Sequence, residues 1–230
     1  MQTAQDLDRA MGALRQSIAN QDQVKSESKY LNEDPTVKAN YDQAVQRAED
    51  IINATQNPEL NKGTIEQATQ AVQNAEQALH GVEKLNQDKT TASKELNNLT
   101  NLTDAQREKL KELINHSDSR DDIKQELEQA KQLNNAMEQL KNQVALKDSV
   151  HSSSNYFNED SAQKQAYDDA IKHAEDIIKN TNNPNINPQD IIKALNNIKT
   201  ATDNLHGEQR LQNEKDTSNN SICLLYTSDA

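Results

Sequence analysis

The chain contains two copies of one sequence unit, and this repeat restricts the possible folds more than any other feature. Residues 41–81 align without a gap on residues 167–207, an offset of 126 residues, and 18 of the 41 positions are identical. The register continues upstream, where Leu7, Met11, Leu14, Val24, Tyr30, Asn32, Glu33 and Asp34 match Leu133, Met137, Leu140, Val150, Tyr156, Asn158, Glu159 and Asp160. Such a fixed period is typical of repeat proteins, so we expect modules that fold locally along the chain.

Each copy carries apolar stripes at helical spacing. In the first copy these are Leu7, Met11, Leu14 and Ile18, then Tyr41, Ala44, Val45, Ala48, Ile51 and Ile52, and finally Ile65, Ala68, Val72, Ala75 and Leu79. Pro58 separates the last two stripes, because the residue before a proline is driven out of the α region, and Thr64 is placed to cap the next helix. Since these stripes cannot be buried singly, each copy is predicted to form a three-helix bundle.

Composition supports a helical chain and excludes several kinds of partner. Only 4 glycines and 4 prolines occur in 230 residues, too few for the turns of all-β and α/β folds. The low hydrophobic content (33%) and the net charge of -12 also occur in disordered chains, but the helical periodicity favours a folded one. Because negative charge repels phosphate groups and anionic lipids, we expect neither nucleic acid nor a membrane surface as a partner. The sequence has no run of about 18 apolar residues, so direct membrane insertion is not expected either.

The middle of the chain is predicted to be a different, smaller bundle. Thr103, Asp104 and Gln106 resemble a capping box, and residues 117–119 are placed to cap a third helix that begins near Arg120. No glycine or proline interrupts residues 120–152, so this helix is expected to run on into the second copy over about 45 Å. The predicted fold class is all-α, with tandem three-helix bundles joined by long shared helices into an elongated rod.

These patterns divide the chain into four segments. The predicted modules are a three-helix bundle at 1–81 that begins within a shared helix, a smaller one at 82–130 and a third at 131–215. Residues 216–230 depart from the repeat and contain the single cysteine, Cys223, so we expect a disordered tail or an appended extension. Gly81 is expected either to cap a helix or to soften a continuous one, and the softened, continuous helix is the favoured interpretation. The chain is expected to be a fragment without its own export signal or anchor.

No residue pattern points to catalysis, a cofactor or a metal ion, so we expect a protein that is not an enzyme. The chain has no GxSxG, P-loop or dinucleotide motif, and its histidines match no spaced His/carboxylate pattern. His80 and His206 each precede a glycine, a position where histidine commonly ends a helix. Paired acids such as Glu33–Asp34 and Glu159–Asp160 are interpreted as solvated surface, because carboxylates are rarely buried unpaired.

Four of the few aromatic side chains occupy two positions of each repeat. Tyr30 and Tyr156 precede the second helix of their copies, and Tyr41 and Tyr167 lie just inside it. Packing at the loop between the first two helices is the favoured interpretation, because aromatic residues in an apolar stripe usually serve the core. A platform for a carbohydrate or a peptide is the alternative, and it makes these four tyrosines candidate partner-binding residues.

Two known module families match these segments in their motifs. Residues 41–81 (YDQAVQRAEDIINATQNPELNKGTIEQATQAVQNAEQALHG) resemble a FIVAR module, and residues 92–134 (ASKELNNLTNLTDAQREKLKELINHSDSRDDIKQELEQAKQLN) resemble a GA, or albumin-binding-type, module. Their alternation over residues 1 to about 215 resembles the repeat region of the staphylococcal Ebh family of giant extracellular-matrix-binding-protein homologues. The resemblance implies a very large, wall-associated surface protein with affinity for fibronectin.

The resemblance also indicates where a GA module would bind albumin. In that family the binding face comprises the second helix, the loop after it and the start of the third helix, here residues 110–123. The candidate partner-binding residues on this segment are Leu113, His116, Asp118 and Arg120. Aspartates at positions 118, 121 and 122 would be costly to desolvate against a partner without cations, so albumin binding by this copy is not expected.

The expected function is that of a non-enzymatic repeat fragment of a giant bacterial surface protein, located at the cell surface or cell wall. It would act as a rod-like adhesive or structural element that binds fibronectin or another host matrix protein weakly, with avidity along the array. The alternatives are a pure spacer or cell-envelope brace, and a module that binds cell-wall glycan.

Overall fold

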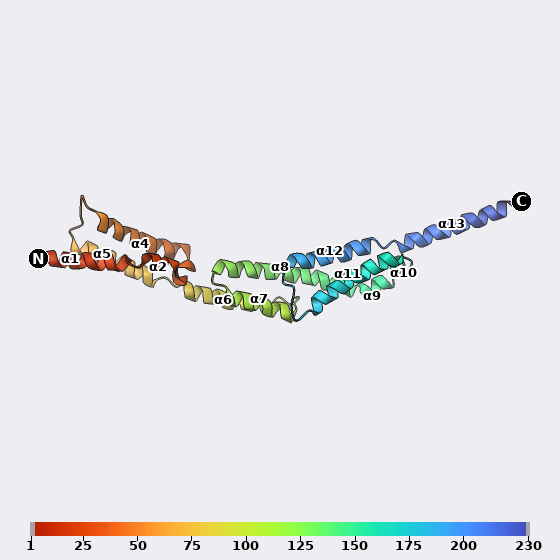
Figure 1. Cartoon of the computed structure of the whole chain (residues 1–230), viewed down its shortest axis with the longest axis horizontal. Helices are drawn as coiled ribbons and strands as arrows, with labels where there is room; N and C mark the ends of the chain where they lie inside the picture. Colours follow the sequence, from red (N-terminus) through yellow and green to blue (C-terminus); the bar gives the residue numbers. More distant parts are fainter. Residues whose placement is uncertain (1–2, 229–230) are drawn as a thin grey trace. The chain divides into compact units, whose positions relative to one another are not determined.

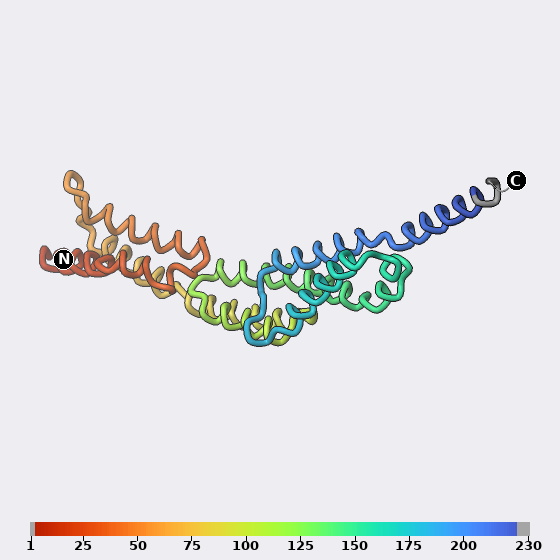
Figure 2. The backbone as a smooth tube through the Cα atoms, turned by 45° about the vertical axis from the view of Figure 1, so that its right-hand side comes forward, coloured from red at the N-terminus to blue at the C-terminus, as the bar shows by residue number. Residues whose placement is uncertain are grey.

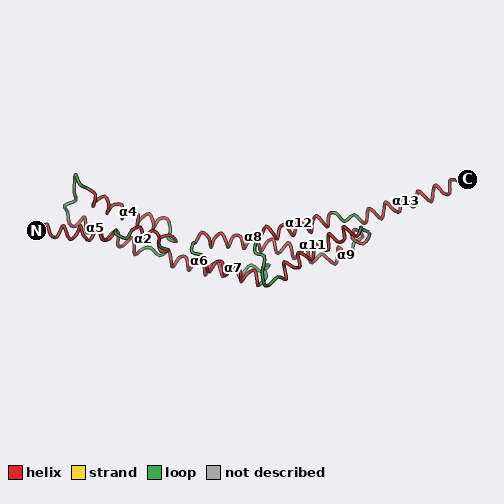
Figure 3. The backbone as a smooth tube through the Cα atoms, in the orientation of Figure 1, coloured by secondary structure: helices red, strands yellow, loops and turns green. Residues whose placement is uncertain are grey.

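The computed structural model describes residues 3–228, and within this range the chain consists of helices joined by loops, without strands (Figure 3). The all-α prediction is confirmed. None of the helices in this range combines the length and the apolar character that crossing a membrane requires.

The helices form two compact units. The first comprises the chain up to Ala92 together with His116–Lys124, and the second comprises Ser93–Asn115 and the chain from Gln125 onward. Helices α6 (Gly81–Asn97) and α8 (Arg120–Ala145) each contribute residues to both units, so shared helices join the tandem bundles as predicted (Figure 1). The units divide within these helices, and the module boundaries predicted after residues 81 and 130 stay predictions.

In the first unit, three helices of the first copy pack side by side. They are α1 (Ala4–Ile18), α4 (Pro35–Asn53) and α5 (Lys62–Gln77), and the short helices α2 (Gln21–Ser26) and α3 (Ser28–Leu31) connect α1 to α4. Thr3 caps α1 through a capping box with Asp6. Pro35 is the first residue of α4, a position whose backbone N–H has no partner within the helix, so the missing N–H of proline costs no hydrogen bond.

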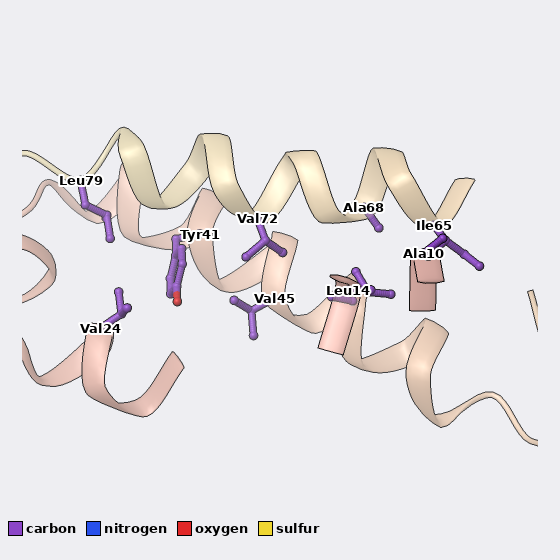
Figure 4. Packing of buried hydrophobic residues seen from close by; sticks show 10 residues of the cluster. Ala10, Leu14, Val24, Tyr41, Val45, Ile65, Ala68, Val72 and Leu79 are labelled. Carbon is purple, nitrogen blue, oxygen red and sulfur yellow. The ribbon is translucent and has the colours of Figure 1, made fainter. Parts of the chain in front are cut away.

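The predicted apolar stripes meet in one core. Figure 4 shows Leu14, Tyr41, Val45 and Val72 directed into the space between the helices, and each is at most 2% exposed. Alanines at positions 10, 48 and 68 let the helix backbones approach closely there. Full burial of each large apolar side chain contributes about 1.5–3 kcal/mol, so this core stabilises a bundle of otherwise polar helices.

The second unit repeats this bundle with α8, α11 (Ser161–Lys179) and α12 (Pro188–Asp203), which lie side by side in Figures 1 and 2. Short helices α9 (Lys147–His151) and α10 (Ser154–Phe157) precede α11, and α13 (Gly207–Ser228) follows α12. Helix α7 (Asp104–His116) starts with the predicted capping box, in which Thr103 and Gln106 exchange hydrogen bonds of 3.0 and 3.2 Å. The Gln106 side chain is fully buried and also donates to the carbonyl of Asn185 at 2.8 Å.

The structure corrects the expectation of a helix that continues through Gly81. The chain leaves helical geometry at residues 78–80, and Gly81 begins α6, with the His80 carbonyl accepting from the Lys84 N–H at 3.1 Å. A Cβ on Gly81 would lie 2.5 Å from the Lys29 carbonyl oxygen, so only glycine permits this approach of α3. His80 therefore starts one helix instead of ending another, and His206 does the same before Gly207.

Three smaller expectations also change. Asn61 caps α5, with its side chain accepting from the Gly63 N–H at 2.8 Å, because the helix starts two residues before Thr64. The helix from Arg120 ends at Ala145, and a turn at Leu146 separates it from α9. Residues 216–228 are helical as part of α13, which differs from the disordered tail expected there, and residues 229–230 lie outside the described range. An appended origin of this segment stays a prediction.

Substitution of Gly81 by alanine tests the close approach of α3. Because the added Cβ would meet backbone atoms, Gly81→Ala is expected to lower the free energy of unfolding by about 2 kcal/mol in chemical denaturation. Gly12 is the matched control, since it lies within α1 and a Cβ there would meet nothing within 4 Å. Gly12→Ala should stabilise by about 0.5–1 kcal/mol. Equal effects of the two substitutions would contradict the steric argument.

Candidate partner-binding surface

The loop between α3 and α4 holds a buried carboxylate that binds the start of α6. Glu33 is 4% exposed, and its carboxylate accepts from the backbone N–H of Asp34 at 2.7 Å and of His80 at 2.5 Å. The Lys84 ammonium pairs with the same carboxylate and lies 2.5 Å from Asp34 Oδ2. We call Asn32, Glu33, Asp34 and Lys84 the junction clamp.

The junction clamp keeps its acids ionised. Burial alone would raise the pKa of Glu33, but hydrogen bonds from Lys84 and from the backbone of Asp34 and His80 more than offset this and hold the pKa below its usual value. Hydrogen bonds from Lys84 and Arg120 lower the pKa of Asp34 as well. The clamp is therefore a satisfied charge network, not the solvated acidic surface that the sequence suggested for this pair.

Two candidate residues of the middle module bind this same loop within the first unit. The Asn32 side chain donates to the Asp118 carbonyl at 2.9 Å and accepts from the Arg120 N–H at 3.0 Å. The Arg120 guanidinium pairs with Asp88 at 2.6 Å and with Asp34 at 2.8 Å. Arg120 thus serves the packing of the first unit, while the Asp118 side chain is exposed.

The second copy builds an equivalent clamp with different cations. Glu159 is 8% exposed, and its carboxylate accepts from the backbone N–H of Asp160 at 2.9 Å and from that of His206. Arg210 replaces Lys84 and pairs with both acids. The sequence contained a signal for this contact, because both the Glu-Asp pair and the His-Gly pair 47 residues later occur in both copies.

The two inner tyrosines are core residues. Tyr41 and Tyr167 are 0% and 1% exposed, and burial raises the pKa of each hydroxyl to about 12. The Tyr41 hydroxyl is buried without a hydrogen-bond partner among the described residues. The packing interpretation therefore fits these two, and neither offers a ring face to a ligand.

Each outer tyrosine, Tyr30 or Tyr156, belongs to a surface that has the same contacts in its own copy. Tyr30 donates to Asp42 and Tyr156 to Asp168, each at 2.8 Å, and their rings meet Tyr41 and Tyr167 edge-on. A lysine lies over each outer ring at 5.5 or 5.7 Å from its centroid. These are Lys38 and Lys164, which also donate to the carbonyls of Leu31 and Phe157 at 2.6 and 2.7 Å.

Leu31 and Phe157 project from this surface. They occupy equivalent positions in the repeat and are 56% and 75% exposed. Each copy therefore has what we call an exposed patch, made of Tyr30, Leu31 and Lys38 in the first copy and of Tyr156, Phe157 and Lys164 in the second. Leu31 and Phe157 are not among the binding residues predicted from the sequence, although an apolar residue next to the outer tyrosine in both copies was the available signal.

The remaining candidates lie on the middle module. Leu113 is half-buried on α7, and His116 ends this helix with an exposed side chain. Ser119 Oγ accepts from the N–H groups of Asp121 and Asp122 at 3.2 and 3.4 Å, which confirms the predicted cap of α8. Within the described part of the chain, no group of three His, Cys, Asp or Glu side chains could hold a metal ion.

Comparison with known families identifies the modules. The FIVAR domain family matches residues 10–80 and 136–206, and the GA module family matches residues 82–136. The chain is 44% identical over 212 residues to the extracellular matrix-binding protein EbhA of Staphylococcus aureus strain Newman, and 45% identical to EbhA of strain Mu3. These alignments cover 92% of this chain but only 6% and 3% of the relatives' length.

Solved structures agree with this assignment. The crystal structure of EbhA residues 756–1003 from S. aureus superposes with a TM-score of 0.81 and 31% identity, over 92% of this chain and 84% of that one. A structure from work on Staphylococcus epidermidis adherence to fibronectin mediated by Embp, an extracellular matrix binding protein, has a TM-score of 0.52 and 41% identity. It covers 54% of this chain and 98% of its own.

Removal of the buried carboxylate should destabilise the first unit. Glu33→Ala leaves the N–H groups of Asp34 and His80 without their acceptor, so we expect a loss of about 2–4 kcal/mol in chemical denaturation. Asp50→Asn is the matched control, because Asp50 is exposed on α4 and, among the residues that the structure describes, accepts a hydrogen bond only from Gln46. The control should change stability by less than about 0.5 kcal/mol. An equal change in the free energy of unfolding in both variants would contradict a stabilising role of the clamp.

The clamp also predicts a loss of stability in acid. Because the pKa values of the clamp residues Glu33 and Asp34 are lowered in the folded state, as is that of Asp42 outside the clamp, the unfolded state binds more protons. Their stabilising contribution is therefore present above the ordinary carboxyl pKa and is lost as the pH falls from about 5 toward 2. Denaturation at pH 7 and pH 3 should show the fall, and Glu33→Gln should reduce it. An identical fall in Glu33→Gln would assign the effect to other acids.

Proposed function

Since the chain belongs to the staphylococcal family of extracellular-matrix-binding proteins with FIVAR and GA modules, we propose that it is an adhesive and structural repeat element of the bacterial surface. Each module would bind a host matrix protein of the fibronectin type weakly, and the repeats would hold the modules in series. The chain would carry out no catalysis. The elongated rod expected from the sequence belongs to this proposal.

The exposed patch is the observation that carries the adhesive part. Both copies present a large apolar side chain, Leu31 or Phe157, beside an aromatic ring and a lysine ammonium. An isolated exposed apolar residue is ordinary on a protein surface, but here the same three chemical groups recur at the offset of the repeat. Aromatic and apolar anchors surrounded by polar groups are the usual centres of protein interfaces.

Weak sites fit a repeat protein. A single patch of three side chains is smaller than a stable protein interface, which buries about 800 Å² on each partner. Linked copies raise the local concentration of sites, so the overall avidity can exceed the affinity of one module by about 10²–10⁴. The similarity to the Embp structure from the work on adherence to fibronectin supports fibronectin as the first partner to test.

The other functions rest on fewer observations. A wall-glycan platform would need open ring faces, and Tyr41 and Tyr167 are buried. Albumin binding at the middle module meets the exposed aspartates at positions 118, 121 and 122, and Arg120 is already paired with Asp34 and Asp88. A pure spacer or envelope brace is the remaining alternative, and it differs from the adhesive function in predicting no saturable binding.

Binding to immobilised fibronectin tests the proposal. We expect saturable binding when the chain is titrated to about 100 μM, and we expect the double variant Leu31→Asp/Phe157→Asp to bind at least about tenfold more weakly. The matched control is Leu60→Asp/Ile192→Asp, which changes two other exposed apolar residues, one in each unit (64% and 38% exposed). Its affinity should stay within about twofold of the parent.

Three other results would count against parts of the proposal. Undiminished binding by the patch variant would place the site elsewhere. Equal losses in both double variants would indicate a nonspecific effect of added charge. No saturable binding by the parent chain would favour the spacer.

A further inference from the structure

We propose that the second copy carries a docking site for the start of the third helix of another GA-type module, formed by Asn158, Asp160 and Glu214. The occupant is a segment with the chemistry of Asp118–Arg120, supplied by a further module of the same kind. This inference concerns the assembly of modules and does not depend on fibronectin binding.

The first copy shows how such a segment is held. The amide of Asn32 binds two backbone groups at once, the Asp118 carbonyl at 2.9 Å and the Arg120 N–H at 3.0 Å. The Arg120 guanidinium then reaches the carboxylates of Asp34 and Asp88 at 2.8 and 2.6 Å. Together, one amide and two carboxylates bind a helix start that carries an arginine.

The second copy has the same groups at the offset of 126 residues. Asn158 corresponds to Asn32, Asp160 to Asp34 and Glu214 to Asp88. The Asn158 amide donates only to Ser154, and its side-chain oxygen accepts no hydrogen bond from a described residue. Asp160 is paired with Arg210, and Glu214 is exposed and forms no ion pair within residues 3–228.

The side chains at this site are also less buried in the second copy than in the first. Asn32 is 5% exposed under its occupant, whereas Asn158 is half-buried. Leu85 on α6 is 6% exposed, whereas its counterpart Leu211 on α13 is half-buried. The surface that is covered in the first copy is therefore open in the second.

The charges around the open surface indicate which chemical group it would bind. In the first copy, Lys84 and Arg120 face the acids Glu33, Asp34 and Asp88. The second copy keeps three acids, at positions 159, 160 and 214, with Arg210 as the cation that pairs with them. It therefore has room for one more cation. In the first copy, the amide of Asn32 binds a carbonyl and an N–H two residues apart. A free cation could not make both bonds with the equivalent Asn158 amide, so the geometry favours an arginine at a helix start.

An extended chain tests the site. Residues 216–230 are replaced by a second copy of residues 90–145, so that the repeat register continues after Lys215. We expect amide hydrogen exchange in residues 207–215 to slow by about tenfold or more relative to the present chain, because docking would protect the start of α13. Asn158→Ala and alanine at the copied Arg120 position should each remove most of this slowing.

The two substitutions should act on the same contact. When they are combined, the loss of protection should be no larger than that of the stronger single variant, whereas independent effects would add. Gln209→Ala is the matched control, since Gln209 is exposed on α13 and lies outside the proposed site. It should leave the exchange rates within about twofold of the extended parent.

Unchanged exchange in the extended chain would overturn the proposal, and so would slowing that neither substitution reduces. All variants carry the same added helices, so a failure of these helices to fold would abolish the slowing and count against docking. Fibronectin binding is not measured in this experiment, so its outcome is separate from that of the adhesive function.

Discussion

The buried carboxylate of Glu33 is the interaction on which the first unit depends. It joins the loop before α4 to the first residues of α6 by accepting from two backbone N–H groups and pairing with Lys84. An ionised carboxylate can be buried only when such partners replace its water. With these bonds made, the end of the three-helix bundle and the start of the middle module form one compact body.

Close backbone approach and charge pairing require each other at this junction. Gly81 lets α6 begin against the backbone of α3, which brings the His80 N–H within reach of Glu33. Asn32, next in sequence to Glu33, then binds the start of α8. Because consecutive residues of one short loop contact two different helices, a small change in that loop would move both.

Sequence reasoning predicted the core but not the junction. The apolar stripes located α1, α4 and α5, and the aromatic spacing identified Tyr41 as a packing residue, because helical periodicity records which face is buried. Glu33 was assigned to the solvated surface because charged residues are seldom buried, and its three partners lie at least 47 positions away or in the backbone. The turn at Leu146 was missed because no glycine or proline marks it.

The two copies fill equivalent core positions with side chains of different size. Val45 and Val72 are buried in the first, and Ile171 and Ile198 are buried at the same places in the second. A helix exchanged between the copies during folding would bring extra methylene groups into a core with no space for them, or leave a void in the other. Such misfits cost about 1–3 kcal/mol each, so divergence between neighbours disfavours domain-swapped misfolding in a chain of repeated bundles.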